Sequence, residues 1–170
     1  TGQIHAIGDL VLAMACRDCA AMNGRGLQDL RVSVNVSAVQ FRSEEFCETV
    51  REVLEQTGLP PAHLELELNE ATFPKHAEDA VRRVVTLRQM GVRIAIDRFG
   101  SGAADIGALK VLPVNKIKMD RSFCQNITSD YRAAAIVGGV VSMAHNLGVV
   151  VVADGVETEA QRDYLRKLNC

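Results

Sequence analysis

The sequence is poor in aromatic residues, in net charge and in long apolar runs. It has no tryptophan, its aromatic content is 4%, and the formal net charge of its 170 residues is −2. The longest apolar stretch, AAAIVGGVVSMA, ends before His145 and is too short to span a bilayer. A nearly neutral chain also lacks the basic surface that favours binding to DNA or to an anionic membrane. We therefore expect neither nucleic acid nor a membrane as a partner of this domain.

Cysteines are few, and their number is odd. Five cysteines without a repeated framework are typical of a reducing compartment, and no secretory signal opens the sequence, so we expect a cytoplasmic protein. The CxxC of Cys16 and Cys19 could be half a zinc site or a redox pair. It lies in a helical pattern, however, and no second CxxC or histidine pair accompanies it. This context favours a structural role for both thiols.

The composition is that of an ordinary folded domain, 48% hydrophobic and 24% charged. Segments with helical periodicity alternate with short β-rich runs. Helices are expected near residues 7–22, 43–57, 77–90, 133–146 and 159–168. Strands are expected at RVSVNVS, LELELNE, RIAID, NKIKMD and GVVVVADGVE, which are residues 31–37, 64–70, 93–97, 115–120 and 148–157. This alternation predicts parallel βαβ units, and the lack of a low-complexity linker predicts a single domain over residues 1–170.

Three of the expected strands carry polar side chains on one face. Buried parallel strands are usually continuous apolar runs, but here polar and apolar residues alternate, so each strand has one polar face. The polar sets are Ser33, Asn35 and Ser37; Glu65 and Glu67; and Lys116, Lys118 and Asp120. In an open doubly wound sheet helices cover both faces, and unpaired inward charges would be costly. In a barrel the polar faces line the lumen, so a barrel is favoured.

Chemically active side chains gather where the expected strands end. Asn35, Glu67, Asp97 and Asp154 lie at or near the carboxyl ends of four strands, and Lys118 lies on another. Oxygen ligands of this kind suit Mg²⁺ or Mn²⁺, and a lysine among carboxylates could orient a water or, as the neutral amine, deprotonate it. The alternative is that these are ordinary salt-bridged residues at strand ends. Their convergence from five strands favours a site.

Five motifs then stand in a distinctive order along the chain: VNVS, ELNE, DRFGSG, IKMDRSF and ADGVETEAQ. They resemble the EAL family, the cyclic di-GMP phosphodiesterases of bacterial signalling, whose usual forms are NxS, ELTE, DDFGTG, KIDxSF and AEGVETxxQ. The resemblance covers nearly the whole chain. It implies an α/β fold of the TIM-like (β/α)8 barrel type. In this family two divalent cations activate a water that cuts cyclic di-GMP to linear pGpG.

The resemblance also implies roles for individual residues. Asn35, Glu67 and Asp97 match metal ligands, which are expected to hold Mg²⁺ or Mn²⁺. Lys118 matches the lysine that contacts the catalytic water. Glu70 matches the glutamate that steadies the loop after Asp97.

Two departures from the family pattern point to a degenerate site. Asp154 and Glu157 match the acidic pair of the last motif. The resemblance implies that both contact the substrate and that Asp154 also takes part in catalysis. Asp154 replaces a glutamate, however, and its carboxylate is shorter by one methylene. Arg98 replaces the second aspartate of the DD pair, which helps to hold the second metal. A guanidinium cannot ligate a cation and repels it, although it can contact a phosphate of the substrate.

The family's first and last strands are not found in the sequence. The chain opens with TGQIHAIGDLVLAMAC, which resembles the helix after the Glu-Ala-Leu strand, and it stops at LRKLNC, before the family's closing strand. We therefore expect an incomplete barrel that lacks the N-terminal and C-terminal strands. Whether the sequence is a fragment or a natural truncation stays open. In either case the sheet edges beside RVSVNVS and VVVVADGV are expected to be unpaired.

Three functional hypotheses follow from these residues. The first is a catalytically degenerate signalling domain that binds cyclic di-GMP or a protein partner. The second is an active or weakly active Mg- or Mn-dependent phosphodiesterase that gives pGpG. The third is an unrelated barrel in which Arg98 and FGSG bind a phosphate at a helix N-terminus. The resemblance further implies a homodimer, formed through the helices near the DFGTG loop, or a partner domain in a longer protein.

Overall fold

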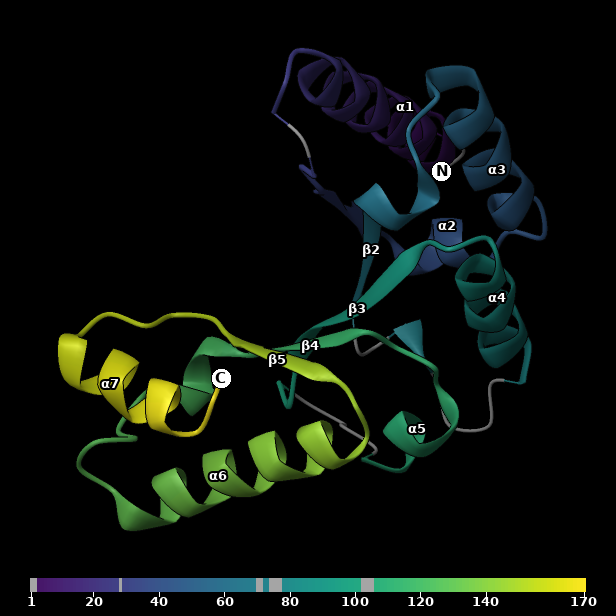
Figure 1. Ribbon diagram of the computed structural model, residues 1–170. Helices are drawn as coiled ribbons and strands as arrows, with labels where there is room; N and C mark the ends of the chain where they lie inside the picture. Colours follow the sequence, from purple (N-terminus) through teal and green to yellow (C-terminus); the bar gives the residue numbers. More distant parts are fainter. Residues whose placement is uncertain (1–2, 28, 70–71, 74–77, 102–105) are drawn as a thin grey trace.

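The computed structural model describes residues 3–27, 29–69, 72–73, 78–101 and 106–170 (Figure 1). Its strands are β1 (Val32–Val36), β2 (Leu64–Asn69), β3 (Arg93–Phe99), β4 (Lys116–Met119) and β5 (Val150–Ala153). Its helices are α1 (Gln3–Gly24), α2 (Ala38–Arg42), α3 (Phe46–Thr57), α4 (Glu78–Gln89), α5 (Ile106–Val111), α6 (Tyr131–Asn146) and α7 (Glu159–Lys167). Two short 3₁₀ helices, η1 (Pro61–His63) and η3 (Arg121–Phe123), complete the described elements.

The sheet is parallel throughout, and its strand order β1-β2-β3-β4-β5 follows the chain. Each new strand is therefore added at the same edge. A doubly wound sheet reverses its order at a switch point, whereas a (β/α)8 barrel adds strands in one direction. The expectation of parallel βαβ units in barrel order is confirmed, and the open doubly wound alternative is excluded for the described strands.

The apolar faces of the strands pack against the helices and form the core. Figure 1 shows α1 and α3 side by side near the first strands, with α6 running along β5, and these elements contact one another. Core members from the strands include Val34, Leu66, Ile94, Ile117 and Val151, and those from the helices include Phe41, Val50, Val84, Leu87, Val137 and Val141. Burial of each such side chain contributes roughly 1.5–3 kcal/mol. This packing leaves the alternate residues of the strands on the opposite face, and in β1, β2 and β4 these residues are polar.

The expected helices and strands are all present, with shifted ends. The first helix begins earlier than expected, at Gln3, and the fourth strand is shorter than the run that predicted it. The sequence interpretation did not predict α2, α5 or the two 3₁₀ helices, because five or six residues are too few to show helical periodicity. The start of α2 is nevertheless encoded locally, since Ser37 and Gln40 form a capping box. None of the described helices combines the length and the apolar character needed to cross a membrane.

The two outer strands of the described sheet are β1 and β5. Each pairs with one neighbour, β1 with β2 and β5 with β4, and no described strand pairs with the other side of either. A free strand edge presents unpaired N–H and C=O groups to other chains. The expectation of open edges at these two strands is therefore confirmed for the described residues.

Because of these edges, the 170-residue chain is expected to self-associate. Size-exclusion chromatography with light scattering over a range of concentrations should show a mass that increases with concentration. A well-behaved monomer at high concentration would mean that the edges are protected in a way the fold does not reveal.

Candidate functional site

The polar face of the sheet carries two layers of charged side chains, and the deeper layer is built around Glu65. This carboxylate is only 3% exposed. Ser33 Oγ donates to its Oε1 at 3.0 Å, Lys116 Nζ donates to the same oxygen at 2.6 Å, and Arg93 Nε lies 3.6 Å from Oε2. A buried carboxylate is tolerated only when it is paired and hydrogen-bonded in this way. We call these four residues the Glu65 cluster.

The upper layer is built around Lys118, at the carboxyl end of the sheet. Its Nζ lies 2.9 Å from Glu67 Oε2, 3.2 Å from Asp97 Oδ1 and 3.9 Å from Asp154 Oδ2. The partners come from β2, from β3 and from the residue after β5. We call these four residues the Lys118 cluster. The structure therefore brings together four of the side chains that the sequence placed at strand ends.

The Lys118 cluster has a definite electrostatic state. Burial alone would lower the pKa of Lys118, but hydrogen bonds and Coulombic attraction to Glu67 and Asp97 outweigh it and raise that pKa above its ordinary value. Lys118 is thus a firmly protonated ammonium that can orient a water or a phosphate oxygen and is poorly suited to remove a proton. Against three carboxylates its single charge leaves the cluster net negative, so the cluster still attracts cations.

Asn35 lies on the strand next to this cluster, and β3 is irregular at Arg98, directly after Asp97. Asn35 is opposite Glu67 in the register of β1 and β2. The pairing of β3 with β4 shifts between Ile96 and Phe99, which oppose Ile117 and Met119. One residue of β4, Lys118, is therefore opposite two residues of β3, as in a β-bulge. Strict alternation would have sent Arg98 to the face opposite Asp97.

Arg98 differs in surroundings from the residues of the Lys118 cluster. Its backbone is in the left-handed region, with φ of 55°, which is uncommon for a residue with a side chain. The side chain is exposed, and its positive charge lies near Asp120. The backbone N–H of Ser122 donates to Asp120 at 3.0 Å, and this bond, together with the charges of Arg121 and Arg98, lowers the pKa of Asp120. Among the described ion pairs, none joins Arg98 to a carboxylate of the Lys118 cluster.

Glu157, another predicted site residue, lies apart from this cluster. Glu157 is exposed in the loop between β5 and α7, and no ion pair of the described residues links it to Lys118. Glu70 lies outside the described residues, so its expected support of the loop after Asp97 stays a prediction.

Oxygen donors for a hard cation lie beside Lys118. Within the described part of the chain, no three Asp, Glu, His or Cys side chains are arranged as a ready metal site. Glu67 and Asp97 together with the amide of Asn35 on the adjoining strand offer oxygen donors of the kind that Mg²⁺ and Mn²⁺ take. The family resemblance leads us to expect a second cation at Arg98, whose guanidinium offers no ligand.

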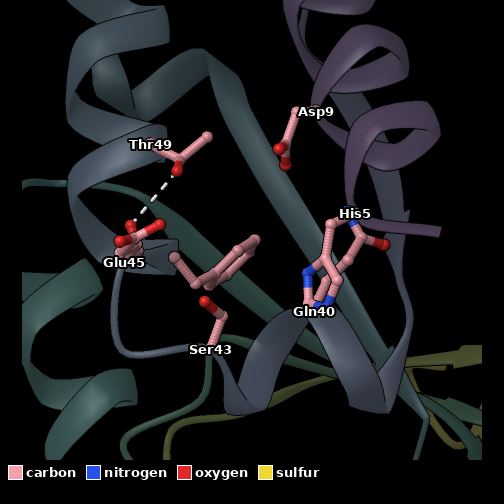
Figure 2. A pocket seen from close by; sticks show the side chains of 7 residues that line it. His5, Asp9, Gln40, Ser43, Glu45 and Thr49 are labelled. Carbon is pink, nitrogen blue, oxygen red and sulfur yellow. Dashed lines mark hydrogen bonds between the residues drawn. The ribbon is translucent and has the colours of Figure 1, made fainter. Parts of the chain in front are cut away.

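A polar hollow lies away from the strand ends, between α1 and the α2–α3 segment (Figure 2). It encloses about 220 Å³ and is lined by His5, Asp9, Gln40, Ser43, Glu45, Phe46 and Thr49. Two of its polar groups are used internally. Thr49 Oγ1 donates to the carbonyl oxygen of Glu45 at 3.1 Å, and Gln40 Oε1 accepts from Ser37. None of the residues that line this hollow belongs to the Lys118 cluster.

The CxxC pair is part of the core, as the sequence interpretation favoured. Cys16 is fully buried and Cys19 nearly so. Burial raises the pKa of Cys16 to about 11, and the neighbouring Cys19 thiol adds to the increase. Both groups are thus neutral thiols at physiological pH, which does not suit zinc binding or thiol exchange.

Known proteins resemble this chain over nearly its full length. The EAL domain family matches residues 1–170. An uncharacterized signaling protein of Caulobacter vibrioides is 43% identical over 169 residues, which are 99% of this chain and 20% of the relative. MucR of Pseudomonas aeruginosa, a bifunctional diguanylate cyclase and cyclic di-GMP phosphodiesterase, is 39% identical over 170 residues, which are 100% of this chain and 25% of MucR.

A solved structure of the MucR phosphodiesterase in complex with cyclic di-GMP has the same fold. Its TM-score is 0.92 at 39% identity, and the match covers 100% of this chain and 69% of that one. The chain thus spans only a fifth to a quarter of the length of these curated relatives.

Replacement of Lys118 by methionine should destabilise the protein, because Glu67 and Asp97 would lose the ammonium between them. We expect the free energy of unfolding at pH 7 to fall by about 1–3 kcal/mol, reduced from the cost at a fully buried pair because solvent reaches part of the cluster. Urea denaturation measures this change. Lys110→Met, at an exposed position of α5, is the matched control and should cost less than about 1 kcal/mol.

The same pair of variants tests the raised pKa of Lys118. A pKa that is higher in the folded state gives a stabilisation that is complete below the ordinary lysine value of about 10.4 and is lost as the pH rises through the folded-state value. Alkaline pH should therefore destabilise the wild type more than Lys118→Met. Equal losses in the two would show that Lys118 is not held by the carboxylates.

Proposed function

The chain belongs to the EAL domain family, and we propose that it is a cyclic di-GMP signalling domain that binds this dinucleotide without cleaving it. The observation that carries the proposal is the position of Arg98 at the β3 irregularity, next to Asp97 and opposite Lys118. Two-metal hydrolysis needs a cation on the attacking oxygen and another on the leaving oxygen. At this position the chain supplies a fixed positive charge in place of a metal ligand.

Arg98 and Lys118 suit the binding of a phosphodiester. A guanidinium offers a planar fork of donors that matches two phosphate oxygens, and an ammonium adds a compact charge. Lys118 is already protonated and held at the carboxyl end of the sheet. Arg98 is exposed, so it can reach a ligand without first leaving a buried partner. Asp154 and Glu157 are proposed to accept hydrogen bonds from the dinucleotide, and Asp154 also keeps the catalytic position of its motif.

The proposal also includes one Mg²⁺ or Mn²⁺ ion as a cofactor, in place of the two ions of the family. Asn35, Glu67 and Asp97 would hold one such ion, which would supply positive charge beside a phosphate oxygen. Binding of the dinucleotide is proposed to depend mainly on this chain's own cations, so the ion is not required for affinity.

A second candidate is an active or weakly active phosphodiesterase that gives pGpG. It is favoured by the contacts of Lys118, whose Nζ lies within 4 Å of a carboxylate oxygen of Glu67, of Asp97 and of Asp154. This is the arrangement of acidic groups and a lysine that the family's chemistry uses. The short side chain of Asp154 and the cation at Arg98 argue against an efficient reaction.

A homodimer and a partner domain in a longer protein also remain proposals. Exposed apolar side chains support the first, since Val111 of α5 and Ile136 of α6 are each 58% exposed. The expected cytoplasmic location rests on the cysteine content and stays a prediction.

Cyclic di-GMP should bind almost equally well in EDTA and in excess Mg²⁺. Isothermal titration calorimetry measures both affinities. Arg98→Ala should weaken binding about ten- to a hundredfold, as expected for loss of a charge-assisted contact to phosphate. Arg132→Ala removes a comparable charge from the exposed start of α6 and serves as the control. Affinity that collapses on chelation, or that survives Arg98→Ala, would remove Arg98 from this role.

The double substitution of Arg98→Asp with Asp154→Glu should restore the family's acidic groups. We expect hydrolysis to pGpG in Mn²⁺ only in a longer chain that also supplies the glutamate of the Glu-Ala-Leu motif. Chromatography of the products measures this hydrolysis. Activity of the doubly substituted 170-residue chain alone would show that the further ligand is dispensable.

A further inference from the structure

Gln161 of the ADGVETEAQ motif makes contacts that the sequence interpretation did not assign. It lies in the first turn of α7, where Thr158 is the N-cap. Its Oε1 accepts from the backbone N–H of Glu157 at 2.8 Å and from that of Thr158 at 2.9 Å. The Thr158 hydroxyl in turn accepts from the backbone N–H of Gln161 at 3.2 Å. These bonds form a capping box, which is a local device for starting a helix.

The other end of the same amide reaches a distant part of the chain. Gln161 Nε2 donates to the carbonyl oxygen of Cys124 at 3.0 Å. Cys124 is the C-cap of η3, and η3 is the element that follows β4, the strand that carries Lys118. A helix cap does not require this bond. One side chain therefore joins the β5–α7 loop to the end of η3.

Two further contacts bring this loop against η3. The backbone N–H of Asp154 donates to the carbonyl oxygen of Met119 at 3.2 Å. Gly155 has a φ of 75°, and a Cβ added to it would lie 2.6 Å from Arg121 Cβ, so the two backbones are in close contact. The loop that carries Asp154 and Glu157 thus rests on the segment from Met119 to Cys124 at both of its ends.

The position of this loop decides where the Asp154 carboxylate lies. Among the three carboxylates of the Lys118 cluster, Asp154 is the farthest from Nζ, at 3.9 Å, and the most exposed, at 45% of its side chain. Glu67 and Asp97 are fixed by strands, at 2.9 Å and 3.2 Å. Asp154 lies beyond the end of β5 and depends on its loop.

We propose that Gln161 is a positioning residue, which holds the Asp154–Glu157 loop on η3 through its bond to Cys124 and so keeps both carboxylates at the ligand site. The bond itself rests on geometry alone. Its effect on ligand affinity rests on the proposed function, in which Asp154 and Glu157 contact cyclic di-GMP.

Gln161→Glu separates the capping interaction of this side chain from its bond to Cys124. A glutamate keeps the oxygen that accepts from Glu157 and Thr158, so the capping box is retained. A carboxylate has no N–H, however, and cannot donate to the Cys124 carbonyl. Ala160→Glu adds the same charge at the preceding, exposed position of α7 and is the matched control. Both variants are made in the intact protein.

Site-resolved hydrogen exchange measures the loop, and thermal unfolding measures the whole fold. Gln161→Glu should speed exchange of the amides from Asp154 to Thr158 by about fivefold or more, the effect of losing one net hydrogen bond. Its melting temperature should stay close to that of the wild type. In calorimetry in EDTA its affinity for cyclic di-GMP should fall several-fold, and Ala160→Glu should match the wild type in all three measurements.

Two results would overturn the positioning role. Unchanged exchange in the loop would show that the Gln161–Cys124 bond does not hold it. Faster exchange with wild-type affinity would show that the loop's position does not matter to the ligand. If the wild type itself failed to bind cyclic di-GMP, the proposed function would be contradicted, and the exchange result alone would then decide whether Gln161 holds the loop.

Discussion

The structure of the site depends on one ion cluster, the ammonium of Lys118 among the carboxylates of Glu67, Asp97 and Asp154. The carboxyl ends of parallel strands lie at the same end of the sheet, so acidic residues at the ends of successive strands lie close together. Without a cation between them they would repel one another. Lys118 supplies that cation, and the deeper Glu65 cluster pairs the charges beneath it. The polar face is therefore stable even though it is lined with charge.

Much of this arrangement could be predicted from the sequence, because it follows from periodicity. The alternation in VSVNVS, LELELNE and KIKMD fixes which residues share a face, and the strand order makes those faces adjacent. The surroundings of Arg98 could not be predicted, since they depend on the extra residue in β3 that upsets the alternation. Gln161 was missed for a different reason. Its bond to Cys124 spans 37 positions of the chain, and no local pattern signals it.

Membership of the EAL family and the local chemistry give different answers on catalysis, and charge explains the difference. The chain has the family's fold and several of its acidic groups, and the proposed binding of cyclic di-GMP depends on them. In the proposed function, Arg98 places a positive charge where the family resemblance expects a metal ligand. Such an exchange preserves attraction for phosphate and removes the means to hold a second metal. On this account a single residue, Arg98, separates binding from cleavage. The loop that carries Asp154 and Glu157 is still held by Gln161.

A crystal structure of the protein with cyclic di-GMP and Mn²⁺, with data collected at the manganese absorption edge, tests this account most directly. We predict an intact dinucleotide, a phosphate in contact with Arg98, and at most one manganese peak, beside Asn35, Glu67 and Asp97. Two manganese peaks a few ångström apart, with Arg98 turned away from the ligand, would contradict it.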